Sequence, residues 1–149
     1  MMIDIAMTMR KLRVAFIGVG NVASAVIQGI HYYRSNPKAD GLWHPEVGGF
    51  TVDDLEVVAA FDVDARKVGK DLSEAIFSEP NSTIKAIEVP RTGVEVRRGI
   101  LRDELNPHMA SSIRVVEGRE EDVLEALRES GADVVVNAIS SGLDGTSRA

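Results

Sequence analysis

The chain has 149 residues, of which 44% are hydrophobic and 27% are charged, values that are typical of one soluble globular domain. Its net charge of −6 argues against nucleic acid or an anionic membrane as a general partner, because both would repel it. The chain contains no cysteine, which excludes disulfides, thiolate metal sites and cysteine nucleophiles, and we expect a cytoplasmic location.

Strands and helices are predicted to alternate in the first half of the chain. Continuous apolar runs indicate strands that are covered on both faces, and apolar residues at helical spacing indicate a helix. In chain order, the predicted elements are a strand at residues 14–17, a helix at 21–34, an inserted loop at 35–54 and a second buried strand at 55–61.

Prolines and glycines interrupt the second half of the chain more often. Asp64 is expected to cap a helix whose apolar side includes Leu72 and Ile76. The elements expected after it are strands at 94–98 and 113–116, a helix at 120–130 that ends at Gly131, and a buried strand at 133–137. We divide the chain into an N-terminal extension (1–12), one domain (13–139) and a mobile C-terminal tail (140–149).

This alternation predicts an α/β fold with a Rossmann-like parallel sheet and helices on both of its faces. Ligands bind to such sheets beyond the carboxyl ends of the strands. Residues 18–23 and the segments that follow Phe61 and Asn137 are expected to meet at that edge.

The most informative motif is Gly18-x-Gly20-x-x-Ala23, which lies between the first predicted strand and the first predicted helix. This is the context that a dinucleotide-binding fingerprint requires. Gly18 would permit the tight turn, Gly20 would let the backbone approach a diphosphate, and Ala23 would allow close helix–strand packing. The alternative is a plain tight turn.

Asp62 directly follows the second predicted strand, where an acid can accept hydrogen bonds from ribose hydroxyls. Its charge favours NAD over NADP, although Arg66 lies close enough in sequence to soften this preference. Asp62 lies 42 positions after Gly20, whereas the usual spacing is about 20. The inserted loop accounts for the excess. The alternative role for Asp62 is that of a turn residue.

The other candidate groups are interpreted as ordinary structural residues. His31, His44 and His108 lack metal-ligand spacing, and the serine pair at 140–141 has no identifiable partner histidine. Trp43 is interpreted as a packing residue. The residues alone therefore assign neither a catalytic group nor a metal site.

Several segments resemble the opening of bacterial and archaeal inositol-3-phosphate synthases. They are residues 17–24 (IGVGNVAS), 41–44 (GLWH), 58–69 (VAAFDVDARKVG), 71–77 (DLSEAIF) and 81–85 (NSTIK). The segments match in order between about residue 13 and residue 137. In that family a loop follows the first helix, which is consistent with the long spacing before Asp62.

The resemblance implies an NAD-binding domain from a family that isomerises glucose 6-phosphate to inositol 3-phosphate, with NAD removing and later returning a hydride. By matching position, the residues expected to contact NAD are Gly18, Val19, Gly20, Asn21 and Val22 in the diphosphate loop, Asp62 at the ribose, and Ala138 after the last strand.

In that family the catalytic lysines lie beyond the point where this chain stops, so none is carried over. We therefore expect a truncated version of the fold that cannot complete the isomerisation alone, and that takes glucose 6-phosphate only if another domain completes it. Uncovered apolar sheet surface near residues 134–136 would favour self-association, so a homo-oligomer is expected. The alternatives are a stand-alone nucleotide-binding module and the cofactor domain of another NAD-dependent oxidoreductase.

Overall fold

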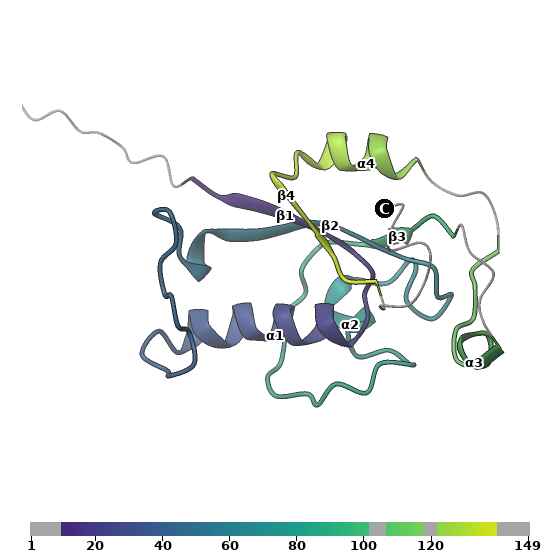
Figure 1. Ribbon diagram of the computed structural model, residues 1–149, viewed down its shortest axis with the longest axis horizontal. Coiled ribbons are helices and arrows are strands. Elements are labelled where there is room, and N and C mark those ends of the chain that lie inside the picture. Colours follow the sequence, from purple (N-terminus) through teal and green to yellow (C-terminus); the bar gives the residue numbers. More distant parts are fainter. Residues whose placement is uncertain (1–9, 102–106, 118–121, 140–149) are drawn as a thin grey trace, which may run out of the picture.

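A computed structural model describes residues 10–101, 107–117 and 122–139. Its centre is a four-stranded parallel sheet in the order β3-β2-β1-β4 (Figure 1). The strands are β1 (Leu12–Ile17), β2 (Leu55–Asp62), β3 (Val96–Arg98) and β4 (Val134–Asn137). The predicted α/β fold with a parallel sheet is therefore confirmed.

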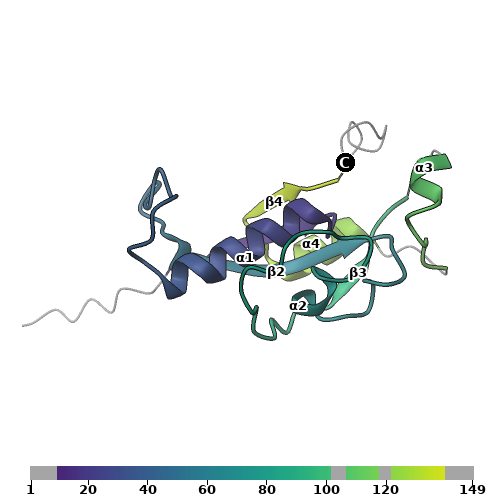
Figure 2. The ribbon, with the colours of Figure 1, turned by 90° about the horizontal axis from the view of Figure 1, so that it is seen from below.

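Helices cover both faces of the sheet, as predicted. Helices α1 (Asn21–Ser35) and α2 (Leu72–Ala75) lie on one face, and α4 (Val123–Ser130) lies on the other (Figures 1 and 2). Within the described residues, no helix combines the length and apolar character that crossing a bilayer requires.

Alternation along the strands divides the hydrophobic core into two layers. Successive strand side chains point to opposite faces, so Phe16 packs with the α1–α2 layer while its neighbour Ala15 packs with the α4 layer. In β2, Ala60 and Phe61 divide in the same way. This two-sided burial explains why the first two strands are continuous apolar runs.

The main predicted elements of the first half are confirmed, with ends shifted by a few residues. β1 begins at Leu12 and β2 continues to Asp62, while α1 ends at Ser35. The inserted loop also contains a short 3-10 helix, Val52–Asp54. Trp43 in this loop is 92% exposed, so its interpretation as a packing residue is wrong.

The predicted helix beginning at Asp64 is also wrong. Residues 65–69 form turns, and α2 begins only after its N-cap residue, Asp71. The Asp64 carboxylate accepts from the Arg66 backbone and guanidinium instead of capping a helix. Gly69 then takes a φ of +84°, which is incompatible with a continuous right-handed helix.

The second half of the chain differs from the prediction in several places. Residues 113–116 form no strand. Within this segment, Val115 pairs with Asp64 in an isolated antiparallel β-bridge. A short helix, α3 (Pro107–Ala110), was not predicted. α4 begins at Val123 and ends before Gly131, the predicted end.

The last strand also differs from the prediction, in its burial. β4 was expected to be buried, but Val134 and Val135 are 40% and 46% exposed because β4 lies at the sheet edge. The exposed side chains of Val134 and Val135 are apolar surface of the kind expected to favour self-association. Self-association itself stays a prediction. The predicted N-terminal extension and C-terminal tail fall largely outside the described residues.

Asp71 connects the start of α2 to the segment before β3. Its Oδ1 accepts from the Ser73 amide and hydroxyl at 2.9 and 2.7 Å, and from the Thr92 amide and hydroxyl at 3.1 and 2.9 Å. Its Oδ2 accepts from the Gly93 amide at 2.8 Å. Burial alone would raise the pKa of Asp71, but the hydrogen bonds from Ser73 and Thr92 outweigh it and lower the pKa below its ordinary value.

We expect Asp71→Asn to be less stable than the wild type by about 1–2 kcal/mol at neutral pH. Because the folded-state pKa of Asp71 is lowered, its contribution is complete above the ordinary value of 3.8 and is lost as the pH falls toward the folded value. Urea unfolding at about pH 7 and about pH 3 measures this difference. An equal gap between variant and wild type at both pH values would contradict the assignment.

Candidate functional site

The loop between β1 and α1, residues 18–22, lies at the carboxyl edge of the sheet; we call it the glycine loop. Gly18 has a φ of +93°, and its amide donates to the Phe61 carbonyl at 2.8 Å. A Cβ on Gly18 would lie 2.9 Å from the backbone carbon and oxygen of Ala138. Both the backbone angle and this close approach therefore require glycine, which confirms a tight turn at Gly18.

Ala138 approaches the glycine loop because the chain leaves β4 beside β1. Its amide donates to the Ile17 carbonyl at 2.7 Å, which continues the pairing of the two strands. The structure thus brings together the three segments expected at this edge: the glycine loop, the residues after Phe61 and the residues after Asn137.

Asp62 contacts the glycine loop directly. Its Oδ2 accepts from the Val19 amide at 2.8 Å. Its Oδ1 accepts from the amides of Val63 and Asp64 at 2.7 and 2.8 Å. Asp62 therefore organises the turn after β2, which was its alternative role, and also fixes the glycine loop. One carboxylate serves both segments because their strands are adjacent.

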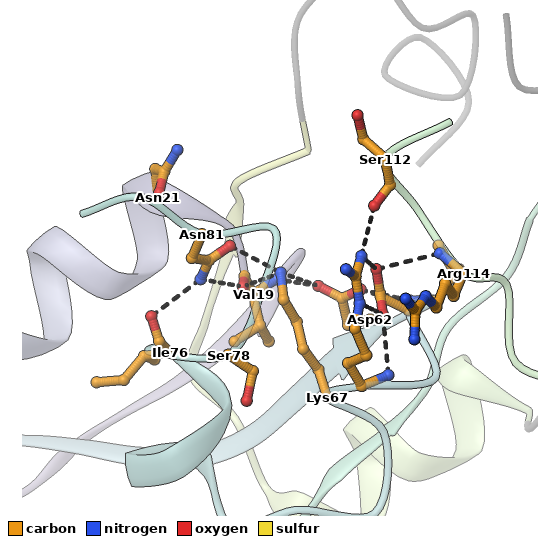
Figure 3. A network of polar contacts seen from close by, with 12 residues as sticks. Val19, Asn21, Asp62, Lys67, Ile76, Ser78, Asn81, Ser112 and Arg114 are labelled. Carbon is orange, nitrogen blue, oxygen red and sulfur yellow. Dashed lines mark hydrogen bonds and ion pairs between the residues drawn. The ribbon is translucent and has the colours of Figure 1, made fainter. Parts of the chain in front are cut away.

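Lys67 lies beneath the glycine loop and is 3% exposed. Its Nζ donates to the Val19 carbonyl and to the Asn81 Oδ1, both at 2.8 Å, and lies 3.7 Å from the Asp62 Oδ2 (Figure 3). Burial lowers the pKa of the Lys67 ammonium, although the Asp62 carboxylate acts in the opposite direction. This buried ion pair compensates the charge of Asp62.

Asn81 completes this network. Its Nδ2 donates to the carbonyls of Val19 and Ile76, both at 3.0 Å. Sequence reasoning missed both Lys67 and Asn81. Lys67 stands in a charged segment that is typical of a solvated surface, and Asn81 follows a proline in a segment without periodicity. No local pattern distinguished either residue.

Gly20 is the N-cap of α1 and has no side chain with which to cap the helix. The first-turn amides of α1 therefore carry the partial positive charge of a helix N-terminus beside the glycine loop. Apart from Gly20 itself and its two chain neighbours, no described residue has an atom within 4 Å of the position that a Cβ on Gly20 would take. The backbone at Gly20 is consequently open to an approaching anion.

The residues that follow Gly20 have different environments. The Asn21 Oδ1 accepts from the amides of Ser82 and Thr83 at 2.8 and 3.1 Å, so this side chain holds a neighbouring segment. Val22 is 59% exposed, whereas Ala23 is fully buried in the core, as expected for the small residue of the motif.

Arg66 lies close enough to Asp62 in sequence to soften a preference for NAD. Its guanidinium forms hydrogen bonds with Asp64 at 2.6 and 2.9 Å, with the Ser112 carbonyl and with Glu79. Burial would raise the pKa of Asp64, but the hydrogen bonds from Arg66 outweigh it and lower the pKa. Arg66 is therefore engaged in an ion pair. Among the described residues, no group of three or more His, Cys, Asp or Glu side chains is arranged to hold a metal ion.

Known proteins resemble this chain in sequence and in structure. No family model matches it. Inositol-3-phosphate synthase of Mycolicibacterium smegmatis is 46% identical over 135 residues, and that of Mycobacterium tuberculosis is 43% identical over 135 residues. Each match covers 89% of this chain and 37% of the relative. The enzyme of Corynebacterium glutamicum is 43% identical over 91% of this chain and 38% of its own length.

Solved structures agree with this relationship. The crystal structure of Ari2 has a TM-score of 0.69 and 32% identity over 87% of this chain and 38% of its own. A myo-inositol-1-phosphate synthase-related protein from Thermotoga maritima, with a TM-score of 0.57 and 24% identity, supports the fold alone. The chain thus spans less than two-fifths of the length of the relatives it matches. Over the part that it spans, it belongs to the inositol-3-phosphate synthase family and corresponds to the N-terminal portion of these proteins.

Proposed function

We propose that this chain binds NAD at the carboxyl edge of its sheet and forms the nucleotide-binding portion of an inositol-3-phosphate synthase. The observation that carries the proposal is the hydrogen bond of 2.8 Å between the Val19 amide and Asp62, which joins the glycine loop to the carboxylate after β2. The two parts of a dinucleotide-binding fingerprint are therefore in contact. The names of the sequence relatives support the same function.

The residues present fit a dinucleotide. Open space beside Gly20 and the N-terminus of α1 provides backbone donors for a diphosphate. Among the described residues, the Asp62 Oδ1 accepts from two amides of the turn after β2. The Oδ2 accepts there from one amide, that of Val19, and lies 3.7 Å from the Lys67 Nζ. We therefore assign the ribose contact to Oδ2. Among the expected contact residues, Gly18 and Ala138 shape the loop, and Val19, Gly20, Asn21 and Val22 line it.

When bound, NAD would supply hydride removal and return, while the protein orients it. The substrate of the complete enzyme, in this proposal, is glucose 6-phosphate. Its conversion is assigned to the part of the relatives that this chain does not match. Cytoplasmic location and assembly into a homo-oligomer belong to the same proposal. The alternative function, a nucleotide-binding module without catalysis, would use the same site geometry. The names of the relatives favour the synthase.

Calorimetric titration with NAD tests the proposal, and Gly20→Ala locates the site. We expect the wild type to bind NAD and Gly20→Ala to bind it about tenfold or more weakly, because a methyl group would occupy the space that the diphosphate approaches. Gly29→Ala is the matched control, since Gly29 also lies in open space but within α1. Its affinity should equal that of the wild type.

Two results would overturn the proposal. One is the absence of NAD binding to the folded wild-type chain. The other is equal NAD affinity in Gly20→Ala and Gly29→Ala, which would place the nucleotide elsewhere. Circular dichroism of each variant verifies that the fold is retained.

A further inference from the structure

Lys67 and Asn81 both donate to the same atom, the carbonyl oxygen of Val19. The distances are 2.8 Å from the Lys67 Nζ and 3.0 Å from the Asn81 Nδ2. The two donors are also joined to each other, because the Asn81 Oδ1 accepts from Lys67 at 2.8 Å (Figure 3). Both side chains therefore draw this carbonyl toward the protein interior.

The Val19 carbonyl and the Gly20 amide belong to one peptide group. Among the described residues the cis peptide bond is that between Glu79 and Pro80, so the peptide between Val19 and Gly20 is trans. In a trans peptide the C=O and N–H groups point in opposite directions. Because the carbonyl points toward buried Lys67, the Gly20 N–H points away from the interior.

The preceding peptide group is held by the other member of the same ion pair. The Val19 amide donates to Asp62, whose Oδ2 lies 3.7 Å from the Lys67 Nζ. Two consecutive peptide groups of the glycine loop are thus fixed by Asp62 and Lys67. Charged partners strengthen such hydrogen bonds relative to neutral ones.

We propose that Lys67 is a positioning residue which, together with Asn81, orients the Val19–Gly20 peptide so that the Gly20 N–H faces the diphosphate of a bound dinucleotide. This inference rests on the proposed function, because it concerns the same site. Lys67 itself is buried and acts through the loop. Without these hydrogen bonds the Val19–Gly20 peptide can rotate. Part of the binding free energy is then spent on ordering the glycine loop.

The test compares Lys67→Met and Asn81→Ala with Lys70→Met. Lys70 is the matched control because it lies in the same segment, is exposed, and donates to the Ser78 hydroxyl instead of the glycine loop. NAD affinity is measured by calorimetry and adenosine affinity by NMR titration. Adenosine carries the ribose without the diphosphate.

We expect Lys67→Met and Asn81→Ala each to weaken NAD binding by about tenfold, as loss of a hydrogen bond of this kind implies. The affinity of Asn81→Ala for adenosine should stay within about twofold of the wild type, because this variant keeps the ion pair between Lys67 and Asp62. Lys70→Met should match the wild type for both ligands.

The outcomes separate this inference from the proposed function. If the wild type does not bind NAD, the proposed function fails. If the wild type binds NAD, and Lys67→Met and Asn81→Ala bind it with the same affinity as Lys70→Met, the positioning role is wrong. A parallel loss of NAD and adenosine affinity in Asn81→Ala would also overturn it, because general destabilisation acts on both ligands. Should Lys67→Met fail to fold, Asn81→Ala decides, as it removes only a neutral side chain.

Discussion

Replacing Gly18 with alanine is expected to destabilise the protein by about 2–6 kcal/mol. A φ of +93° is unfavourable for a residue with a Cβ, which costs about 1–3 kcal/mol. The new methyl group would also lie 2.9 Å from the Ala138 backbone, and overpacking of this kind adds about 1–3 kcal/mol. Backbone atoms cannot rotate away as a flexible side chain can, so β4 would have to move from β1.

The free energy of unfolding in urea measures this effect. Gly20→Ala is the matched control because it places the same methyl group in open space two residues later. It should cost less than about 1 kcal/mol. Equal unfolding midpoints for the two variants would show that the close approach of Gly18 to Ala138 does not exist in solution.

The second large effect is expected from Asp62→Ala. This change removes the acceptor of the Val19, Val63 and Asp64 amides and takes from buried Lys67 the carboxylate with which it forms an ion pair at 3.7 Å. We expect a loss of about 3 kcal/mol or more in the free energy of unfolding, because removing one member of a buried pair leaves an uncompensated charge. NAD affinity should fall together with stability, since the same carboxylate holds the glycine loop.

Asp53→Ala is the control for this change. Asp53 is exposed, and its substitution should alter stability by less than about 0.5 kcal/mol. Urea unfolding at neutral pH compares the two variants, and calorimetry with NAD reports the affinity at a temperature where both are folded. Wild-type stability of Asp62→Ala would contradict the role of Asp62 as the acceptor for three backbone amides.

Local patterns in the sequence predicted the framework of this protein. The apolar runs of β1 and β2, the helical spacing of α1 and the position of Gly18 are properties of neighbouring residues. Such patterns are readable without a structure because burial on both faces requires continuous apolar residues, and one buried helix face requires a period near 3.6. The sequence also placed Asp62 at the end of a strand, next to the glycine loop.

Local patterns were insufficient where a residue's partner lies far away along the chain. Asp64 resembles a helix cap in sequence, yet its Oδ2 accepts from the amide of Arg114, 50 positions later. The apolar residues of β4 suggest burial, but the sheet order places this strand at an edge.

The sequence by itself determined the succession of β1, α1 and β2, the glycine turn and the acid that follows β2. Only the tertiary structure decided that Lys67 and Asn81, 48 and 62 positions after Val19, converge on its carbonyl. The physical reason is that hydrophobic periodicity is a local property, whereas hydrogen-bond partners are chosen by proximity after the chain has folded.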